Sequence, residues 1–304
     1  MRAVFHGDER SRAVAGLILL TLVLTSPTRA AEPRLRVVAS FSILGDFVRN
    51  VGGERVELAT LVGPNGDAHV YAPAPSDAKT VAAADLLVIN GLGFEGWLPR
   101  LVASTGKHAA IVEASHGVAP RHASEAGADQ IDPHAWQSVA NAKIYVANIR
   151  DALASADPAG AASYAANAAA YLQKLDALDA EIHAAVAKIP PARRQVVSTH
   201  DAFGYFADAY GISFVAPQGV STDTEPTARD IAAIILLVRV THIPAVFLEK
   251  LGDPRLIRRI SAETGARIGG TLYSDSLSEA DGDAPTYIDL MKHNIRELTR
   301  ALAD

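Results

Sequence analysis

Apolar residues recur every three or four positions along one long stretch just past the midpoint of the chain. Between Pro158 and Ile189 they form a single stripe, made of Tyr164, Ala168, Tyr171, Leu175, Leu178, Ile182, Val186 and Ile189. Asp157 can cap the first turn, and Pro190-Pro191 ends the pattern. The spacing predicts one helix over residues 158–189, on the order of 48 Å long at roughly 1.5 Å per residue. Because a small domain needs less, we expect this helix to join two lobes.

Short apolar runs alternate with helical spacing on both sides of this helix. Before it, we expect strands at 35–40, 57–62, 85–90 and 109–113, and helices at 42–51, 75–83, 98–104 and 139–154. After it, we expect strands at 195–199, 213–216, 245–249 and 267–272, and helices at 201–210, 227–240, 253–264 and 286–302. The polar stretch 114–132 has no regular pattern, so we expect an irregular segment there. This alternation predicts an α/β fold of two lobes, each a mostly parallel sheet with flanking helices, over residues 31–157 and 190–304.

The first thirty residues have the pattern of a secretory signal peptide. Arg10 and Arg12 precede the apolar run Ala13–Leu24, and Ala30 ends a stretch that suits cleavage. The apolar run is too short to span a bilayer. We therefore expect residues 1–30 to be removed on export to the periplasm.

Composition limits both the location and the partners of the mature protein. The chain has 304 residues, 49% of them hydrophobic, which is enough for two ordinary domains, and no cysteine. Without cysteine there is no thiolate metal site and no lipid-modified cysteine, so we expect a free periplasmic monomer that is not lipid-anchored. Without the first thirty residues, 24 Lys and Arg stand against 32 Asp and Glu, a formal charge of −8 that argues against nucleic acid as a partner.

Four side chains stand out because each follows a predicted strand or precedes a predicted helix: His69, His134, His200 and Asp275. Ligands of open α/β sheets bind at the carboxyl ends of the strands, so a cleft between the lobes could bring all four together. Three neutral imidazoles and one carboxylate suit zinc and also accept manganese or iron.

A second motif, Gly91–Gly96, matches the glycine pattern of dinucleotide-binding loops. Its context argues against that function. The preceding strand is the third of its lobe, and Glu95 would place a negative charge where a pyrophosphate needs the positive end of a helix. We expect a tight turn instead, with Phe94 and Trp97 packed in the lobe.

At the four candidate residues the sequence resembles the solute-binding proteins of zinc and manganese ABC transporters. The matching segments are 63–73, 132–136, 198–206 and 272–276, in order along the chain. The resemblance implies a periplasmic receptor whose two lobes are bridged by a rigid helix. It further implies that His69, His134, His200 and Asp275 bind one divalent ion, which the receptor delivers to an ABC permease in the inner membrane. No catalytic residue and no organic cofactor are implied.

Two departures bear on the metal. Zinc members often carry a long loop rich in His and Asp before the second ligand, whereas residues 118–131 contain only His122 and Asp129. Manganese members often have Glu at the position of His200. The third imidazole favours zinc, with manganese as the alternative. A periplasmic zinc-dependent hydrolase remains the other functional hypothesis, in which the three histidines hold the metal and Asp275 acts as a base.

Overall fold

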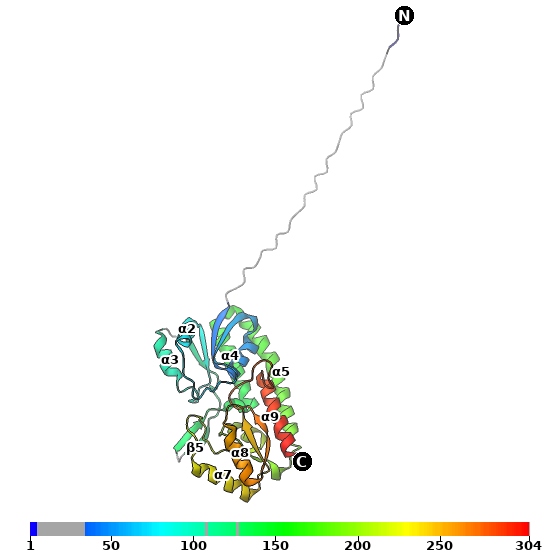
Figure 1. The fold of residues 1–304 in the computed structure, drawn as a ribbon. Coiled ribbons are helices and arrows are strands. Elements are labelled where there is room, and N and C mark those ends of the chain that lie inside the picture. Colours follow the sequence, from blue (N-terminus) through cyan, green and yellow to red (C-terminus); the bar gives the residue numbers. More distant parts are fainter. Residues whose placement is uncertain (5–33, 107–108, 126–127, 304) are drawn as a thin grey trace. The chain divides into compact units, whose positions relative to one another are not determined.

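A computed structural model describes residues 1–4, 34–106, 109–125 and 128–303 (Figure 1), so the predicted signal peptide lies almost wholly outside the described residues. Residues 34–304 form one unit, separate from residues 1–33. No helix in the described ranges is both long and apolar enough to cross a bilayer.

Each lobe of this unit is built on a four-stranded parallel sheet. The first sheet has the order β2-β1-β3-β4, with β1 Leu35–Phe41, β2 Val56–Val62, β3 Leu86–Ile89 and β4 Ala110–Glu113. The second has the order β10-β9-β7-β8, with β7 Gln195–Val197, β8 Ser213–Val215, β9 Ala245–Glu249 and β10 Arg267–Leu272. The predicted two-lobed α/β fold is confirmed.

Helices flank both sheets. Those of the first lobe are α1 Ser42–Gly52, α2 Pro75–Ala83, α3 Leu98–Thr105 and α4 Val139–Ala156. Those of the second are α6 Gly204–Tyr210, α7 Ala228–Thr241, α8 Pro254–Thr264 and α9 Tyr287–Leu302. Single 3-10 turns occur at η1 Gly53–Arg55, η2 Ala135–Gln137 and η4 Pro191–Arg193. Local sequence fixes where some of the helices begin. Thr227 and Asp230, for example, form a reciprocal capping box at the start of α7.

The long central helix, α5, spans Ala161–Val186 and is preceded by the 3-10 turn η3 Pro158–Gly160. It is therefore shorter at both ends than the predicted 158–189. At the start, the Asp157 carboxylate accepts from Gly160 N and holds the turn. At the end, the backbone tightens to 3-10 hydrogen bonds up to Ile189, because Pro190 disfavours helical geometry before it. The seven stripe residues within α5 are all buried.

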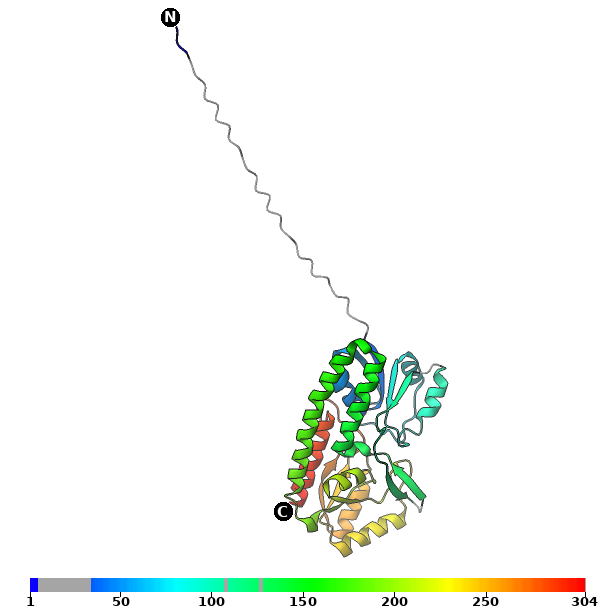
Figure 2. The same ribbon diagram turned by 180° about the vertical axis from the view of Figure 1, so that it is seen from behind.

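α5 runs along both lobes (Figures 1 and 2) and packs against α1 and α4 in the first and against α9 and α6 in the second. One hydrophobic cluster continues from Val37 in β1 through the buried stripe of α5 to Leu302 in α9. Two smaller clusters lie on the other faces of the sheets, one under α2 and α3 and one under α7 and α8. Since the lobes share one core, moving them apart would expose buried apolar surface.

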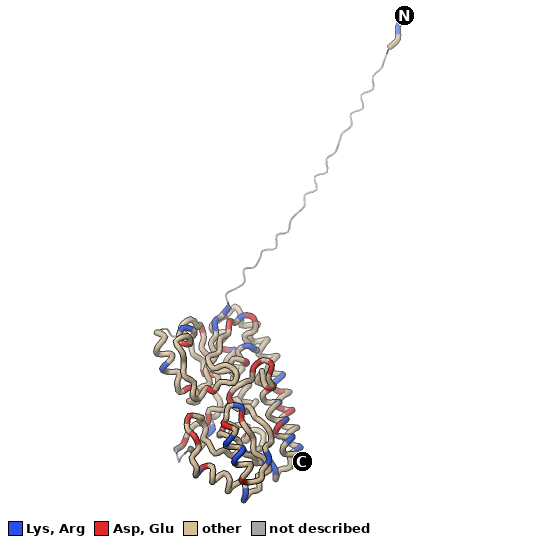
Figure 3. The backbone as a smooth tube through the Cα atoms, in the orientation of Figure 1, with Lys and Arg blue, Asp and Glu red and all other residues tan. Residues whose placement is uncertain are grey.

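The expectation of an irregular segment at 114–132 is wrong. This segment contains an antiparallel hairpin of β5 Arg121–Glu125 and β6 Ala128–Asp132, in which Arg121 pairs with Asp132. The hairpin was missed because its strands are polar and carry no apolar alternation. The predicted helix 201–210 begins only at Gly204, because His200 pairs with Gln218 and Asp201 N bonds to Gly219 O. Acidic and basic residues are interspersed over both lobes (Figure 3).

Candidate metal centre

Four separate loops bring the predicted ligands together. His69 lies between β2 and α2, His134 follows β6, His200 follows β7 and Asp275 follows β10. One ligand atom of each lies within 4.8 Å of all the others. Their side chains are at most 4% exposed. The sequence therefore places four groups that can ligate a metal in one buried cluster.

The three imidazoles present the same ring nitrogen to the cluster. His69 Nε2 lies 3.2 Å from His134 Nε2. Asp275 Oδ2 lies 3.1 Å from His200 Nε2 and 3.7 Å from His69 Nε2, and Asp275 Oδ1 lies 3.5 Å from His134 Nε2. Both carboxylate oxygens therefore face imidazole nitrogens.

The far nitrogens of two rings are held by buried carboxylates. His134 Nδ1 lies 2.8 Å from Asp132 Oδ1, and His200 Nδ1 lies 2.6 Å from Glu249 Oε2. Because a carboxylate only accepts, the hydrogen bond to Asp132 places a proton on His134 Nδ1, and in the neutral imidazole its Nε2 is left with the lone pair. The contact of His200 Nδ1 with Glu249 Oε2 is an ion-pair distance without hydrogen-bond geometry. A second carboxylate of this kind orients metal-binding histidines and fixes their tautomer.

Atoms at the centre of the cluster lack hydrogen-bond donors. Asp275 Oδ1, Asp275 Oδ2 and His200 Nε2 are buried and have no partner with hydrogen-bond geometry among the described residues. When the three imidazoles are neutral, lone pairs face one another in this dry site and repel, and leaving such atoms without a partner costs free energy. A cation at the centre would resolve this repulsion, so the donor set fits a divalent metal.

The two sides of the cluster differ in electrostatics. Burial lowers the pKa of His69 to about 3, although the charge of Asp275 opposes the shift. Burial also disfavours charge on His200, but the carboxylates of Glu249 and Asp275 outweigh it and raise the pKa of His200 well above its usual value. Asp275 is buried too, yet the surrounding histidines, His200 first, lower its pKa. Without metal, these charges favour a proton on His200 and a neutral His69.

Sequence reasoning missed the groups that orient the candidate ligands. Asp132 had a signal, since it stands two residues before His134 and its carboxylate also accepts from His134 N. Glu249 had little signal, because it ends a strand 49 residues from His200 and contacts it only in the folded chain. Asp67 joins the two lobes beside His69: it accepts from His69 N at 2.9 Å and from the Thr222 hydroxyl at 2.7 Å.

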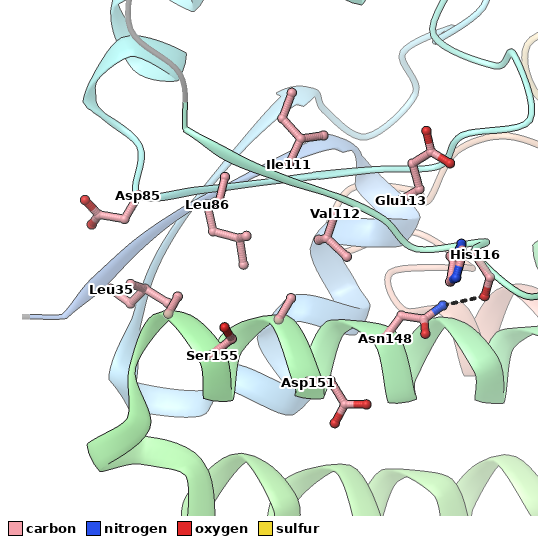
Figure 4. Close-up of a pocket in the computed structure, with 13 residues that line it drawn as sticks. Leu35, Asp85, Leu86, Ile111, Val112, Glu113, His116, Asn148, Asp151 and Ser155 are labelled. Carbon is pink, nitrogen blue, oxygen red and sulfur yellow. Dashed lines mark hydrogen bonds between the residues drawn. The ribbon is translucent and has the colours of Figure 1, made fainter.

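A cavity of about 510 Å³ lies beside His200, with Asp67, Thr222 and Glu249 among its lining residues. A larger one, of about 1010 Å³, lies elsewhere, between β4 and α4 (Figure 4). Its carboxylates are spread along its length, and Asp85 is paired with Arg36. The larger cavity therefore has no convergent set of ligands comparable to the histidine cluster.

The glycine-rich turn at 91–96 is a structural element, as expected. Glu95 is buried and accepts from Ser40 Oγ and from the backbone nitrogens of Asn90 and Gly91. The amides that a phosphate would need are thus bound to the turn's own carboxylate. Phe94 is buried, with its ring centroid 4.7 Å from that of His69, so the turn supports one wall of the centre.

Comparison with known proteins assigns the chain to a family. Residues 37–301 match the family model described as "Zinc-uptake complex component A periplasmic". The chain belongs to this family. It is 39% identical over 269 residues to the manganese-binding lipoprotein MntA of Halalkalibacterium halodurans, covering 88% of this chain and 89% of the relative. It is 34% identical over 280 residues to the iron-binding protein YfeA of Yersinia pestis, covering 92% and 89%.

The fold agrees with that of a solved protein of similar sequence. The periplasmic zinc-binding protein TroA of Treponema pallidum superposes with a TM-score of 0.84 at 30% identity, over 89% of this chain and all of that one. The chain is thus a metal-binding substrate-binding protein of an ABC transporter and not an enzyme. The expectation that the protein is not lipid-anchored conflicts with the name of this relative. MntA is named a lipoprotein, whereas this sequence has no cysteine.

Proposed function

We propose that this protein captures one divalent transition-metal ion with His69, His134, His200 and Asp275 and delivers it to an ABC permease in the inner membrane. The observation that carries the proposal is the buried cluster of ring nitrogens and carboxylate oxygens, several of which lack a donor. Four protein ligands fill a tetrahedral shell and leave no position for an activated water, which suits capture and release. The hydrolase alternative is not favoured, because Asp275 lies within 3.7 Å of all three imidazoles, where a ligand would be.

Zinc is the ion we favour, and manganese is the alternative. Three imidazole nitrogens with one carboxylate oxygen form a donor set typical of zinc. Manganese prefers oxygen, and it could gain a further oxygen ligand if both oxygens of Asp275 bound it. The names of the relatives divide among manganese, iron and zinc, so the donor set supports the preference and the names do not.

Calorimetry with metal-free mature protein tests the proposal directly. We expect one tight zinc site per chain, lost in His200→Ala and unchanged in His122→Ala, an exposed histidine paired with Asp129. No tight site, or two equal ones, would refute it. Because zinc outcompetes manganese at most such sites regardless of biological role, the ion carried in the cell is identified by elemental analysis of protein purified from its own periplasm.

The mature N-terminus and the assembly state are also part of the proposal. With no cysteine to carry a lipid, we infer a free periplasmic protein cleaved after Ala30 and acting as a monomer. An intact mass equal to residues 31–304 supports this, and a mass excess of the size of acyl chains would refute it. Light scattering measures the assembly state.

A further inference from the structure

The base of the β5–β6 hairpin lies beside the metal centre. In the antiparallel register, Arg121 at the start of β5 is opposite Asp132 at the end of β6. Arg121 Nη1 lies 3.2 Å from Asp132 Oδ2. The other oxygen of the same carboxylate, Asp132 Oδ1, lies 2.8 Å from His134 Nδ1. One carboxylate therefore bridges an arginine and a metal-centre imidazole.

This ion pair differs from the exposed ones on the surface. The Asp132 side chain is fully buried, and that of Arg121 is 27% exposed. A buried carboxylate that loses its cation is strongly disfavoured, whereas surface ion pairs contribute little. Arg121 is therefore the cation that balances the buried carboxylate in contact with His134.

Contacts to the second lobe fix Arg121 itself. Its backbone N donates to the Tyr205 hydroxyl at 2.8 Å, and its Nε lies 3.2 Å from Asp208 Oδ2, both on α6. A Cβ at Gly204 would overlap the guanidinium and approach Asp132 Oδ2 to 2.6 Å, so the helix start fits closely over the pair. The planar guanidinium contacts two carboxylates at once, which a lysine ammonium on its flexible stem does less well.

We propose that Arg121 is a positioning residue for metal capture: through Asp132 it holds the His134 imidazole with Nε2 directed at the ion. The inference rests on the proposed function, since it takes His134 as a ligand. Arg121 does not touch the metal. It acts by fixing the carboxylate that fixes the ring, and its contacts to α6 make that arrangement depend on the second lobe.

The test measures Zn²⁺ affinity by competition with a chromophoric chelator, together with the visible spectrum of the Co²⁺ form. Arg121→Gln should weaken Zn²⁺ binding by about 10- to 100-fold, the usual effect of removing such an outer group. It should also alter the Co²⁺ bands. Arg121→Lys keeps the charge next to Asp132 and should recover at least half of that loss on a logarithmic scale.

Two controls separate positioning from general destabilisation. Arg150→Gln is a matched change at a surface pair with Asp151 and should leave affinity unchanged. Asp208→Asn removes only the exposed contact of Arg121 and should change affinity by less than about threefold, as expected for an exposed pair.

A double-mutant cycle gives the decisive outcome. If Arg121 acts through His134, Arg121→Gln should have almost no further effect in the His134→Ala background. An equal loss in both backgrounds would overturn the proposal, as would wild-type affinity and Co²⁺ spectrum in Arg121→Gln. If Arg121→Gln does not fold, the neutral variant Arg121→Met is measured in both backgrounds, and an equal loss in both, or no loss in either, would overturn the proposal. Failure of the wild-type protein to bind Zn²⁺ would instead refute the proposed function.

Discussion

Metal binding should release one proton near neutral pH, and the proton should come from His200. In the metal-free protein this ring lies between Glu249 Oε2 at 2.6 Å and Asp275 Oδ2 at 3.1 Å. The two carboxylates raise the pKa of His200 well above its usual value, even though burial acts against the charge. A metal ion needs the Nε2 lone pair, so it must displace the proton.

His69 and Asp275 should contribute little to this release. His69, with a pKa lowered to about 3, is already neutral, and Asp275, whose pKa is lowered, is already ionised. One displaced proton corresponds to a factor of ten in affinity per pH unit, or about 1.4 kcal/mol. Zinc affinity should therefore rise about tenfold per unit of pH above roughly 6.5, until the pKa of His200 is passed.

Calorimetry in buffers of different ionisation enthalpy counts the released protons directly. We expect about one proton per ion at pH 7 in the wild-type protein and in His122→Ala, whose exposed ring lies outside the centre. Glu249→Gln tests whether the proton comes from His200. This change removes one of the two carboxylates beside the ring and should reduce the number of protons released. Affinity that does not change between pH 6.5 and 8, with no proton released, would refute this account of the centre.

Further predictions concern stability, ligands and motion. The raised pKa of His200 stabilises the metal-free fold fully below roughly pH 6.5, and this stability should be lost as pH rises through the folded-state pKa, seen as a falling melting temperature without zinc. Saturating zinc at about 1,000 times Kd should add about 4 kcal/mol of stability, and a melting temperature indifferent to zinc would contradict the site. Asp275→Ala should weaken zinc binding less than His200→Ala, since water replaces a carboxylate oxygen more readily than a held imidazole; titration of both variants decides. Leu178→Ala should cost about 2–5 kcal/mol in denaturant unfolding, against under about 0.5 kcal/mol for the exposed Lys174→Ala. Hydrogen exchange should leave α5 equally protected with and without metal, and a uniform change along it would show that the helix bends.

The fold was predictable wherever burial imposes a period on the sequence. The stripe from Tyr164 to Val186 and the apolar strands on both sides of it are recognisable because each must turn one face, or both, toward the core. The β5–β6 hairpin was not predictable, since its strands are polar and their pairing depends on backbone hydrogen bonds. The late start of α6 depends on Gln218 and Gly219, which meet His200 and Asp201 only after folding.

In the candidate site, too, some residues were predictable from the sequence and others were not. The four groups now found together each occupy a loop at the end of a regular element, a position that the strand pattern alone marks. Their orienting partners have no such mark. Glu249 resembles any charged residue at the end of a strand, and its role follows only from the pairing of β9 beside β7. The role of Arg121 was harder still to predict, because the segment that carries it was expected to be irregular.

Charge balance connects these partners to the kind of ion that the centre can hold. Among the described groups that contact the rings, Asp132, Glu249 and Asp275 are carboxylates, and Arg121 balances one of them. With neutral imidazoles, two negative charges remain uncompensated in a buried site, and a divalent cation balances both. A proton on His200 balances only one. The metal-free centre is therefore stabilised in part by its own proton, and the return of that proton to His200 would favour release of the ion.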